Sequence, residues 1–392
     1  MGWVWKIAGC IVVFGSGLIA CSMDSAMSRS TPVSRTQANE AGADGPTFVD
    51  ALRPNRRIPV VAVLALNGGT ETTDFLVPYA VLRRAAVAEL EAVAPRQGKV
   101  TLMPALEIDL KTDIESFDRR HPQGADYVIV PAMHVDDDPA VLAWLRAQAG
   151  KGAKIIGICS GALVLGKAGL LDGRRFAGHW YDRRELLERY PTASYVPDRR
   201  YVVDRDVATT TGVSASLPAA LALVEAIGGN DRATALAQEL DANAWGPEHD
   251  SARFKLDAGG IWTYVVNAVA FWRRDAMEIR VREGIDDIKL AFAADAWSRT
   301  GRASVTAVSD SGGPVRTSAG LILKTVSASA LKATVHPLSL SDSVSPAAQL
   351  DRSLCDIQRR YGSWMRAWVA LQMEYQINER ACEPSSPSLP HE

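Results

Sequence analysis

Cys159 is the residue whose type and surroundings most clearly predict chemistry. It stands in the segment Gly157-Ile158-Cys159-Ser160-Gly161, directly after the apolar run 154–158. Glycines on both sides allow a tight turn and let a substrate approach the side chain. The start of a following helix would stabilise the thiolate, which is the nucleophilic form. We therefore predict a nucleophilic Cys159, and the alternative is an inert cysteine buried on a strand.

The elements around this turn predict an α/β fold with a doubly wound, largely parallel sheet. Continuous apolar runs of strand length occur at 59–66, 126–131 and 154–158, as expected for strands buried on both faces. Strands that alternate with helices form such sheets. Helical spacing or capping residues predict helices over 73–90, 136–148, 161–169, 183–189 and 217–227; a further strand is expected at 99–103 and a hairpin over 201–210.

Two segments of this region resemble a known family. GICSGALVLGKAGLLDGRRFAGHW (157–180) resembles the core motif of the ThiJ/PfpI superfamily, which is related to class I glutamine amidotransferases. TTTGVSASLPAALALVEAIGG (209–229) resembles the branch that contains isocyanide hydratase and the N-terminal domains of AraC-type regulators. The resemblance covers about residues 58–229. It implies a flavodoxin-like sandwich with a nucleophilic cysteine at the elbow.

The same resemblance implies partners for the thiol. The acid that contacts the cysteine in the family falls at Asp74, with Glu71 as second choice. A carboxyl group near a thiolate has its own pKa raised, so it can donate a hydrogen bond or move a proton. The alternative for Asp74 is an acid at the N-cap or in the first turn of a helix. Ser160 matches the hydroxyl residue of the hydratase branch, and His179 matches the family's His-Trp pair, where a structural histidine is the other interpretation.

The expected pocket departs from the family in one place. The loop after the first strand begins at Gly69, but the strand before the elbow ends in Ala132-Met133-His134 instead of a glycine-rich turn. Backbone amides near Ala132 and Met133 and at Ser160 are expected to hold an oxyanion. His134 is expected to narrow or enter the pocket. We predict neither a metal nor a cofactor.

The N-terminus predicts export and lipid attachment. Lys6 precedes the apolar run 7–20, which has the length of a signal-peptide core. The run ends in Leu18-Ile19-Ala20-Cys21, which resembles a bacterial lipobox with Cys21 as the lipidated residue. The alternatives are an uncleaved anchor or a simple secretory signal. We expect a protein tethered on the periplasmic side of the cell envelope, with the outer membrane favoured because Ser22 is not the retention residue Asp.

The chain of 392 residues is predicted to hold two folded domains after this leader. The predicted divisions are a signal peptide (1–21), a flexible tether (22–56), the ThiJ/PfpI-like domain (57–229) and a C-terminal α/β domain (230–385). The last contains strand, Gly turn, acid, helix and strand over 277–308, a degenerate half-copy of the first domain that lacks a second elbow. This half-copy could stand in for a partner subunit, and a homodimer stays open. Cys355 and Cys382 could pair in an oxidising compartment or remain thiols.

Composition narrows the function further. The net charge of −2 and the pI of about 6.3 lack the basic footprint of a nucleic-acid-binding protein, and no helix-turn-helix pattern follows residue 229. The first hypothesis is a thiol-dependent hydrolase or hydratase acting on a small electrophile. The second is a sensor or binding module without catalysis, in which the pocket holds a ligand or the thiol registers oxidation. A third is an envelope scaffold with a relic site.

Overall fold

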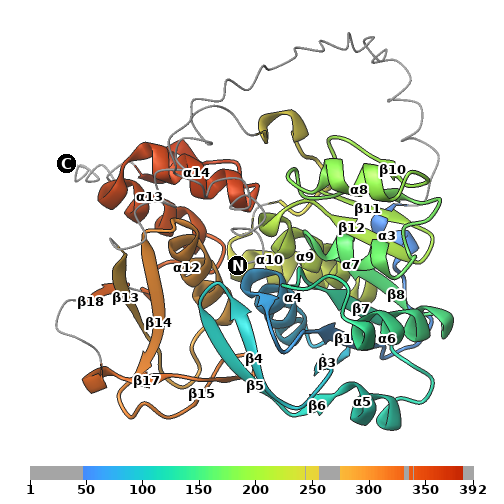
Figure 1. The fold of residues 1–392 in the computed structure, drawn as a ribbon, viewed down its shortest axis with the longest axis horizontal. Coiled ribbons are helices and arrows are strands. Elements are labelled where there is room, and N and C mark those ends of the chain that lie inside the picture. The colour runs from blue at the N-terminus through green and yellow to red at the C-terminus, as the bar shows by residue number, and fades with distance from the viewer. Residues whose placement is uncertain (1–46, 243, 256–273, 331–334, 339, 383–392) are drawn as a thin grey trace, which may run out of the picture. The chain divides into compact units, whose positions relative to one another are not determined.

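The computed structural model describes residues 47–242, 244–255, 274–330, 335–338 and 340–382 (Figure 1). The predicted signal peptide and most of the predicted tether lie outside these residues. The described residues from Phe48 onward form one compact unit. Helix α3 (Phe48–Ala51) falls within the segment predicted as tether, and Phe48 and Leu52 are buried, so the folded chain begins earlier than expected.

Seven strands form the central sheet in the order β11–β12–β8–β7–β1–β3–β6. Neighbouring strands are parallel except for the β11–β12 hairpin. The continuous apolar runs of the sequence occupy its centre, where both faces of a parallel sheet are covered. The strand bounds, in sheet order, are Tyr201–Asp204, Val207–Thr210, Lys154–Gly157, Tyr127–Val130, Val60–Leu64, Glu89–Ala94 and Thr112–Asp113.

Helices cover the two faces of this sheet and create two hydrophobic cores. Alternate residues of β1 face opposite sides, so Val61 and Val63 pack in one core and Ala62 and Leu64 in the other. The first core lies under α3, α4 (Thr72–Ala85) and α9 (Ser216–Gly228), with α10 (Asn230–Leu240) outside α9. The second lies under α5 (Ile114–Arg120), α6 (Pro139–Gly150) and α7 (Gly161–Lys167), with α8 (Arg183–Arg189) beside α7. This confirms the predicted flavodoxin-like α/β sandwich.

One predicted helix is too long. The helical spacing continued to residue 90, but α4 ends at Ala85, and Ala86 adopts a left-handed conformation with φ 52°. The chain then enters β3, a strand of the central sheet that the sequence pattern did not predict. The strand expected at 99–103 forms as β4 (Gly98–Met103), but it belongs to a second sheet.

The second sheet joins the two halves of the chain. Its order is β15–β16–β5–β4–β2, and β16 of the C-terminal half pairs with β5 of the first domain. The remaining bounds are Val315–Arg316 for β15, Ile322–Leu323 for β16, Leu106–Leu110 for β5 and Thr70–Glu71 for β2. The C-terminal half therefore shares a β-sheet with the first domain. A separate pair of short strands, β9 (Arg175–Phe176) and β10 (Ser194–Tyr195), follows the elbow helix.

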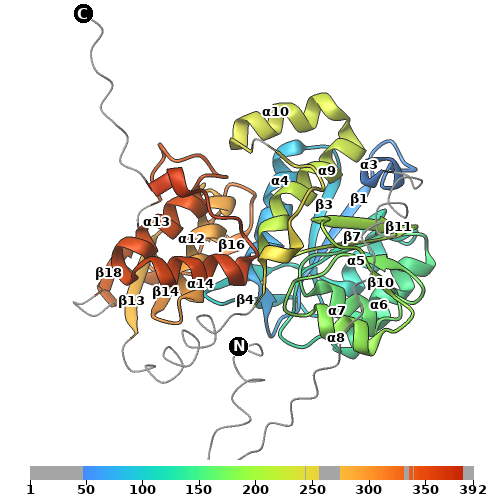
Figure 2. The same cartoon turned by 90° about the horizontal axis from the view of Figure 1, so that it is seen from above.

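The C-terminal half contains a parallel sheet of its own, in the order β17–β14–β13–β18. The predicted strand, turn, helix and strand form as β13 (Asp275–Arg280), α12 (Asp287–Arg299) and β14 (Ala303–Ser309), which repeat the order β1–α4–β3. Helix α12 packs against α4 (Figure 2). The other elements are β17 (Val326–Ser327), β18 (Val335–Leu338), α13 (Gln349–Tyr361) and α14 (Ser363–Met373).

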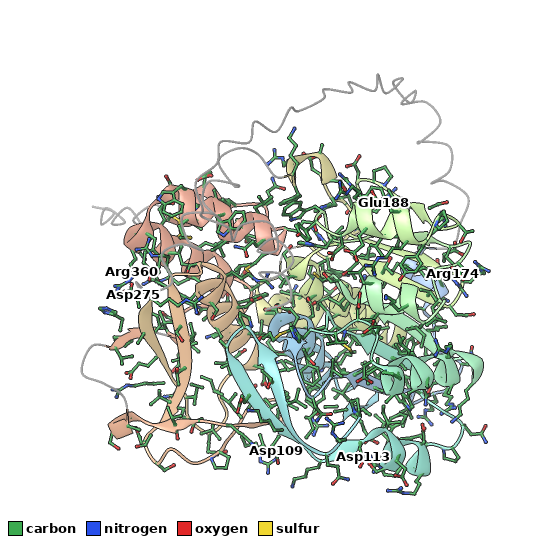
Figure 3. All side chains as sticks on the ribbon, in the orientation of Figure 1. Asp109, Asp113, Arg174, Glu188, Asp275 and Arg360 are labelled. Atoms are coloured by element: carbon green, nitrogen blue, oxygen red, sulfur yellow. A yellow bond between two sulfur atoms is a disulfide. The ribbon has the colours of Figure 1, made fainter. Side chains whose placement is uncertain are left out.

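Two covalent or ionic links fix α13. Arg360 of α13 lies beside Asp275 of β13 (Figure 3), with 2.8 Å between Nη2 and Oδ2. Cys355 of α13 forms a disulfide with Cys382, with 5.3 Å between the Cα atoms. The structure thus contains the pairing that the sequence left open. In the described part of the chain, no helix combines the length and apolarity of a membrane span.

Candidate functional site

The elbow between β8 and α7 holds Cys159 in a conformation that L-residues rarely adopt. Its φ is 55°, in the left-handed region, which costs about 1–3 kcal/mol and persists only where the surroundings enforce it. The amide of Ile158 donates to the carbonyl of Val130 at 2.9 Å. A Cβ on Gly161 would lie 2.1 Å from that same carbonyl oxygen, so only glycine fits there. The sequence motif is therefore explained by close packing of the elbow against β7.

The thiol lies in a closed environment. Cys159 is buried, and its amide donates to Oγ1 of Thr210 at 3.1 Å. Its Sγ lies 3.8 Å from Oγ of Ser160. The Ser160 hydroxyl donates to the buried carboxylate of Asp182. Ser160 can therefore accept a hydrogen bond from the thiol while its own proton is held by Asp182, a residue that the sequence analysis did not select.

Asp74 lies in the first turn of α4 and is fully buried. One carboxylate oxygen accepts from the amide of Ala132 and the other from the hydroxyl of Ser216, each at 3.2 Å. The capping role belongs to Glu71, whose Oε2 accepts from the Asp74 amide at 2.5 Å. Because Glu71 caps the helix, the side chain of Asp74 is left to face the site.

Burial has the largest effect on the pKa values of Asp74 and Cys159. It raises the pKa of Asp74 to about 7, although the amide of Ala132 and the charge of Arg299 oppose the shift. Burial also raises the pKa of the Cys159 thiol well above its usual value, and the carboxylates of Asp74, Asp182 and Glu71 add to the increase. The expectation of a stabilised thiolate is therefore wrong for this arrangement. The thiol stays protonated until a partner takes its proton.

The C-terminal half contributes residues that the sequence analysis missed. Nη2 of Arg299 lies 2.9 Å from Oε1 of Glu71, and Nε of Arg299 lies 2.7 Å from Oδ1 of Asp295. The hydroxyl of Thr73 donates to the other oxygen of Asp295 at 2.9 Å. Asp295 is completely buried among the alanines of α12, and an acid at such a position was the one signal available in the sequence.

The predicted pocket segments pair with each other. The amide of Glu71 donates to the carbonyl of Ala132 at 2.8 Å, and the amide of His134 donates to that of Gly69 at 3.0 Å. A Cβ on Gly69 would lie 2.8 Å from the Cβ of His134, which explains the glycine. The Ala132 amide is engaged by Asp74, so it does not face an oxyanion here, contrary to the prediction. Met133 is half-buried and His134 is exposed rather than inside a pocket.

His179 is buried beneath the C-terminal half. Its Nε2 lies 3.2 Å from the carbonyl oxygen of Gln372, and the neighbouring indole of Trp180 donates to the carbonyl of Leu371 at 2.8 Å. Its Nδ1 has no hydrogen-bond partner among the described residues. These contacts agree with the structural interpretation of His179, since they tie the segment after the elbow to α14.

Other clusters lie away from the thiol. Glu89, Glu91 and His121 bring ligand atoms within 4.8 Å of one another, but β3 begins at Glu89, so they lie at the amino edge of the sheet. Cys159 follows the carboxyl end of β8, at the opposite edge. Arg120 already binds Glu91, and its hydrogen bond together with that of His121 lowers the Glu91 pKa despite burial. The acids of this cluster are therefore structural partners of basic side chains.

The fold and the site define an α/β sandwich whose cysteine occupies a strand-to-helix elbow near a buried acid. Residues 60–226 match the DJ-1/PfpI family, so the chain carries a domain of that family, as the resemblance predicted. Over 106 residues the chain is 35% identical to isonitrile hydratase of Pseudomonas putida, covering 27% of this chain and 45% of that protein. It is 32% identical over 118 residues to the HTH-type transcriptional regulator CdhR of Pseudomonas aeruginosa, covering 30% and 35% of the two chains.

Among solved structures, that of DJ-1beta from Drosophila melanogaster aligns with 48% of this chain and all of its own, at 22% identity and a TM-score of 0.43. The chain spans less than half the length of the two bacterial relatives. The C-terminal half lies beyond the matched residues 60–226.

Proposed function

We propose that this protein is a thiol-dependent hydrolase or hydratase that adds water to a small electrophile, with Cys159 as nucleophile and Asp74 as proton carrier. The supporting observation is the fully buried Asp74, whose pKa of about 7 lets it accept and return a proton near neutral pH. The similarity to isonitrile hydratase favours an isonitrile or a related carbon–nitrogen electrophile as substrate.

The proposed step uses these residues in turn. As Sγ of Cys159 bonds to the electrophilic carbon, Asp74 takes the thiol proton and passes it to the substrate atom that gains the electron pair. Water then adds to the same carbon, the Sγ–C bond breaks, and Sγ regains a proton. With an isonitrile the net change is one water added and an N-substituted formamide released. Ser160, fixed by Asp182, would orient the thiol, whereas His179 has no part in this step.

The test is turnover by the protein lacking residues 1–21. Aliphatic isonitriles and nitriles would be supplied, and formamide or amide release followed by chromatography. Cys159→Ala is expected to abolish turnover, and Ser160→Ala to slow it while leaving the fold intact. Full turnover by the Cys159→Ala protein would contradict the proposal.

The second candidate, a redox sensor, gains support from the disulfide between Cys355 and Cys382, which suits an oxidising compartment. Against it stands the raised pKa of Cys159, because selective oxidation needs an accessible thiolate. Mild peroxide followed by mass spectrometry separates the two. Stable sulfinate on Cys159 in a protein that turns over no substrate would favour the sensor.

We further propose that the protein is a lipoprotein of the cell envelope, held by Cys21 on the periplasmic side, with no nucleic-acid partner. The lipobox-like segment and the disulfide support this location. Cys21→Ser is expected to prevent incorporation of labelled fatty acid and to move the protein from the membrane to the soluble fraction. Unchanged lipid labelling would contradict the assignment.

A further inference from the structure

Two ion pairs link α4 and α12 in both directions. Arg84 is the thirteenth residue of α4, and its Nη2 lies 2.7 Å from Oδ2 of Asp286, the N-cap of α12. Arg299 is the thirteenth residue of α12, and its Nη2 lies 2.9 Å from Oε1 of Glu71, the N-cap of α4. An arginine at the same helix position thus reaches the capping acid of the other helix in each case.

Reciprocal contacts of this kind are the mark of an isologous interface, in which the same surface of two copies meets itself. The correspondence extends beyond the ion pairs. Glu71 and Asp286 each accept a hydrogen bond from the third helical amide, that of Asp74 in α4 and that of Lys289 in α12. The strands flanking each helix are paired in parallel, β1 with β3 and β13 with β14.

We propose that residues 274–309 reproduce within one chain the contact that a second copy of the first domain would make, and that Arg299 is the positioning residue through which they hold the acids beside Cys159. The proposal deepens the proposed function, since Cys159 is the reactive group in both. It also assigns to the C-terminal half a part in the site, although that half has no elbow of its own.

The two ends of the helix pair differ in their burial and in their acidic neighbours, and the more buried end is the one near Cys159. At the Arg84 end, Lys289 occupies the helix position of Asp74, and the second acid near Arg84, Glu239 at 3.9 Å, is 59% exposed. At the Arg299 end, Asp295 bridges Arg299 and Thr73, and the Glu71 side chain is only 9% exposed. The Arg84 end is closer to solvent, since the side chain of Asp286 is 21% exposed. Of the two equivalent ion pairs, the one between Arg299 and Glu71 therefore belongs to the buried site near Cys159.

The charged groups that face the thiol come from three places. Glu71 and Asp74 belong to the start of α4, Asp182 precedes α8, and Arg299 ends α12. Burial raises the pKa values of Glu71, Asp74 and Cys159, and the positive charge of Arg299 opposes the increase in all three. Removing that charge should make the thiol still harder to ionise.

The experiment measures iodoacetamide alkylation of Cys159 against pH in the protein lacking residues 1–21. Cys355 and Cys382 form a disulfide, so Cys159 is the free cysteine of the described chain. Arg299→Met is expected to move the alkylation midpoint up by about one pH unit, which slows alkylation about tenfold at pH 8. Arg299→Lys keeps the charge without the planar fork and should give a smaller shift. Arg84→Met, the matched control, should stay within about twofold of the wild type.

Unpaired buried carboxylates destabilise a fold, so the folding of Arg299→Met is checked by circular dichroism. If this variant is unfolded, a second comparison tests the proposal. E71Q removes one of those carboxylates, so E71Q and E71Q/R299M are compared. The double variant should have a midpoint about one pH unit above that of E71Q. Equal midpoints in this pair, or equal shifts for folded R299M and R84M, would overturn the proposal. Alkylation requires no turnover, so failure of the hydratase proposal would leave this result unaffected.

Discussion

Asp74→Asn should change the reactivity of the thiol and the turnover of substrate in opposite directions. The amide fits the site, because its oxygen can accept from the Ala132 amide and its NH2 group can donate to the Ser216 hydroxyl, where the carboxylate now bonds both at 3.2 Å. The substitution therefore removes a charge while keeping both hydrogen bonds. Any large effect on Cys159 would come from electrostatics and proton transfer.

The magnitude follows from the ionisation of Asp74. With a pKa of about 7, the carboxyl is mostly ionised at pH 8 and raises the pKa of the thiol. Two like charges separated by about 6 Å, the outer limit of the range over which neighbouring charges shift a pKa, repel by about 3 kcal/mol at an effective dielectric constant of about 20, or about 2 pH units. Allowing for relaxation, Asp74→Asn should lower the thiol pKa by about 1–2 units and speed alkylation at pH 8 about tenfold. Turnover should fall at least about 100-fold, because the proton carrier is lost.

Both effects are measured on the same preparations. Iodoacetamide alkylation followed by mass spectrometry gives the rate at Cys159, and formamide release gives turnover. Asp342→Asn is the control, since that side chain is 85% exposed and pairs with Arg282 at the surface. Alkylation that slows or stays unchanged in Asp74→Asn would refute the assignment of Asp74 as the charged neighbour of the thiol.

Three further predictions concern stability. Folded Asp74 keeps a proton that the unfolded chain loses above about pH 4. The free energy of unfolding should therefore fall as pH rises towards 7, by about 1.4 kcal/mol per pH unit relative to Asp74→Asn. Urea unfolding at pH 5, 6 and 7 measures this, and the same pH dependence in both proteins would contradict it. Gly161→Ala should cost about 3 kcal/mol, because its Cβ would lie 2.1 Å from the Val130 carbonyl, whereas Gly150→Ala, with open space, should not destabilise; equal melting temperatures would disprove this. Replacing Cys355 and Cys382 by serine should cost about 3–4 kcal/mol, measured by urea unfolding without reductant, because the bridge spans 27 residues; an unchanged midpoint would show that the bridge is not formed.

The elbow could be predicted from the sequence because its determinants are local. An apolar strand, two glycines and a helix start lie within a few residues of Cys159, and the structure contains all of them. Strand β3 could not be predicted from the sequence, because the helical pattern of α4 continues past Ala85 and only the left-handed Ala86 ends the helix. Helix periodicity reports which face is apolar, whereas the end of this helix depends on a single backbone conformation.

The acid network beside the thiol was beyond sequence analysis for a different reason. Glu71 and Arg299 are 228 residues apart, and an ion pair between them leaves no local pattern in either segment. The sequence did contain the repeated order of strand, turn, helix and strand, but not the face on which the two copies meet. Ala132 shows the same limit, because its amide was expected at an oxyanion and is instead occupied by Asp74.

Under this proposal, the second half takes part in the site around Cys159 without an elbow of its own. Its described residues reproduce β1–α4–β3, the elements that form a helix-to-helix contact, and lack the Gly-x-Cys-x-Gly turn that follows β8 in the first domain. An isologous contact between two identical domains would present Arg84 to Glu71 on both sides. In one chain the two arginines can differ in burial and neighbours. Here the second acid beside Arg299 is the buried Asp295 at 2.7 Å, whereas the second acid beside Arg84 is the exposed Glu239 at 3.9 Å. A fused half-copy can therefore be adjusted to one cysteine without affecting a second, which a symmetric dimer cannot do.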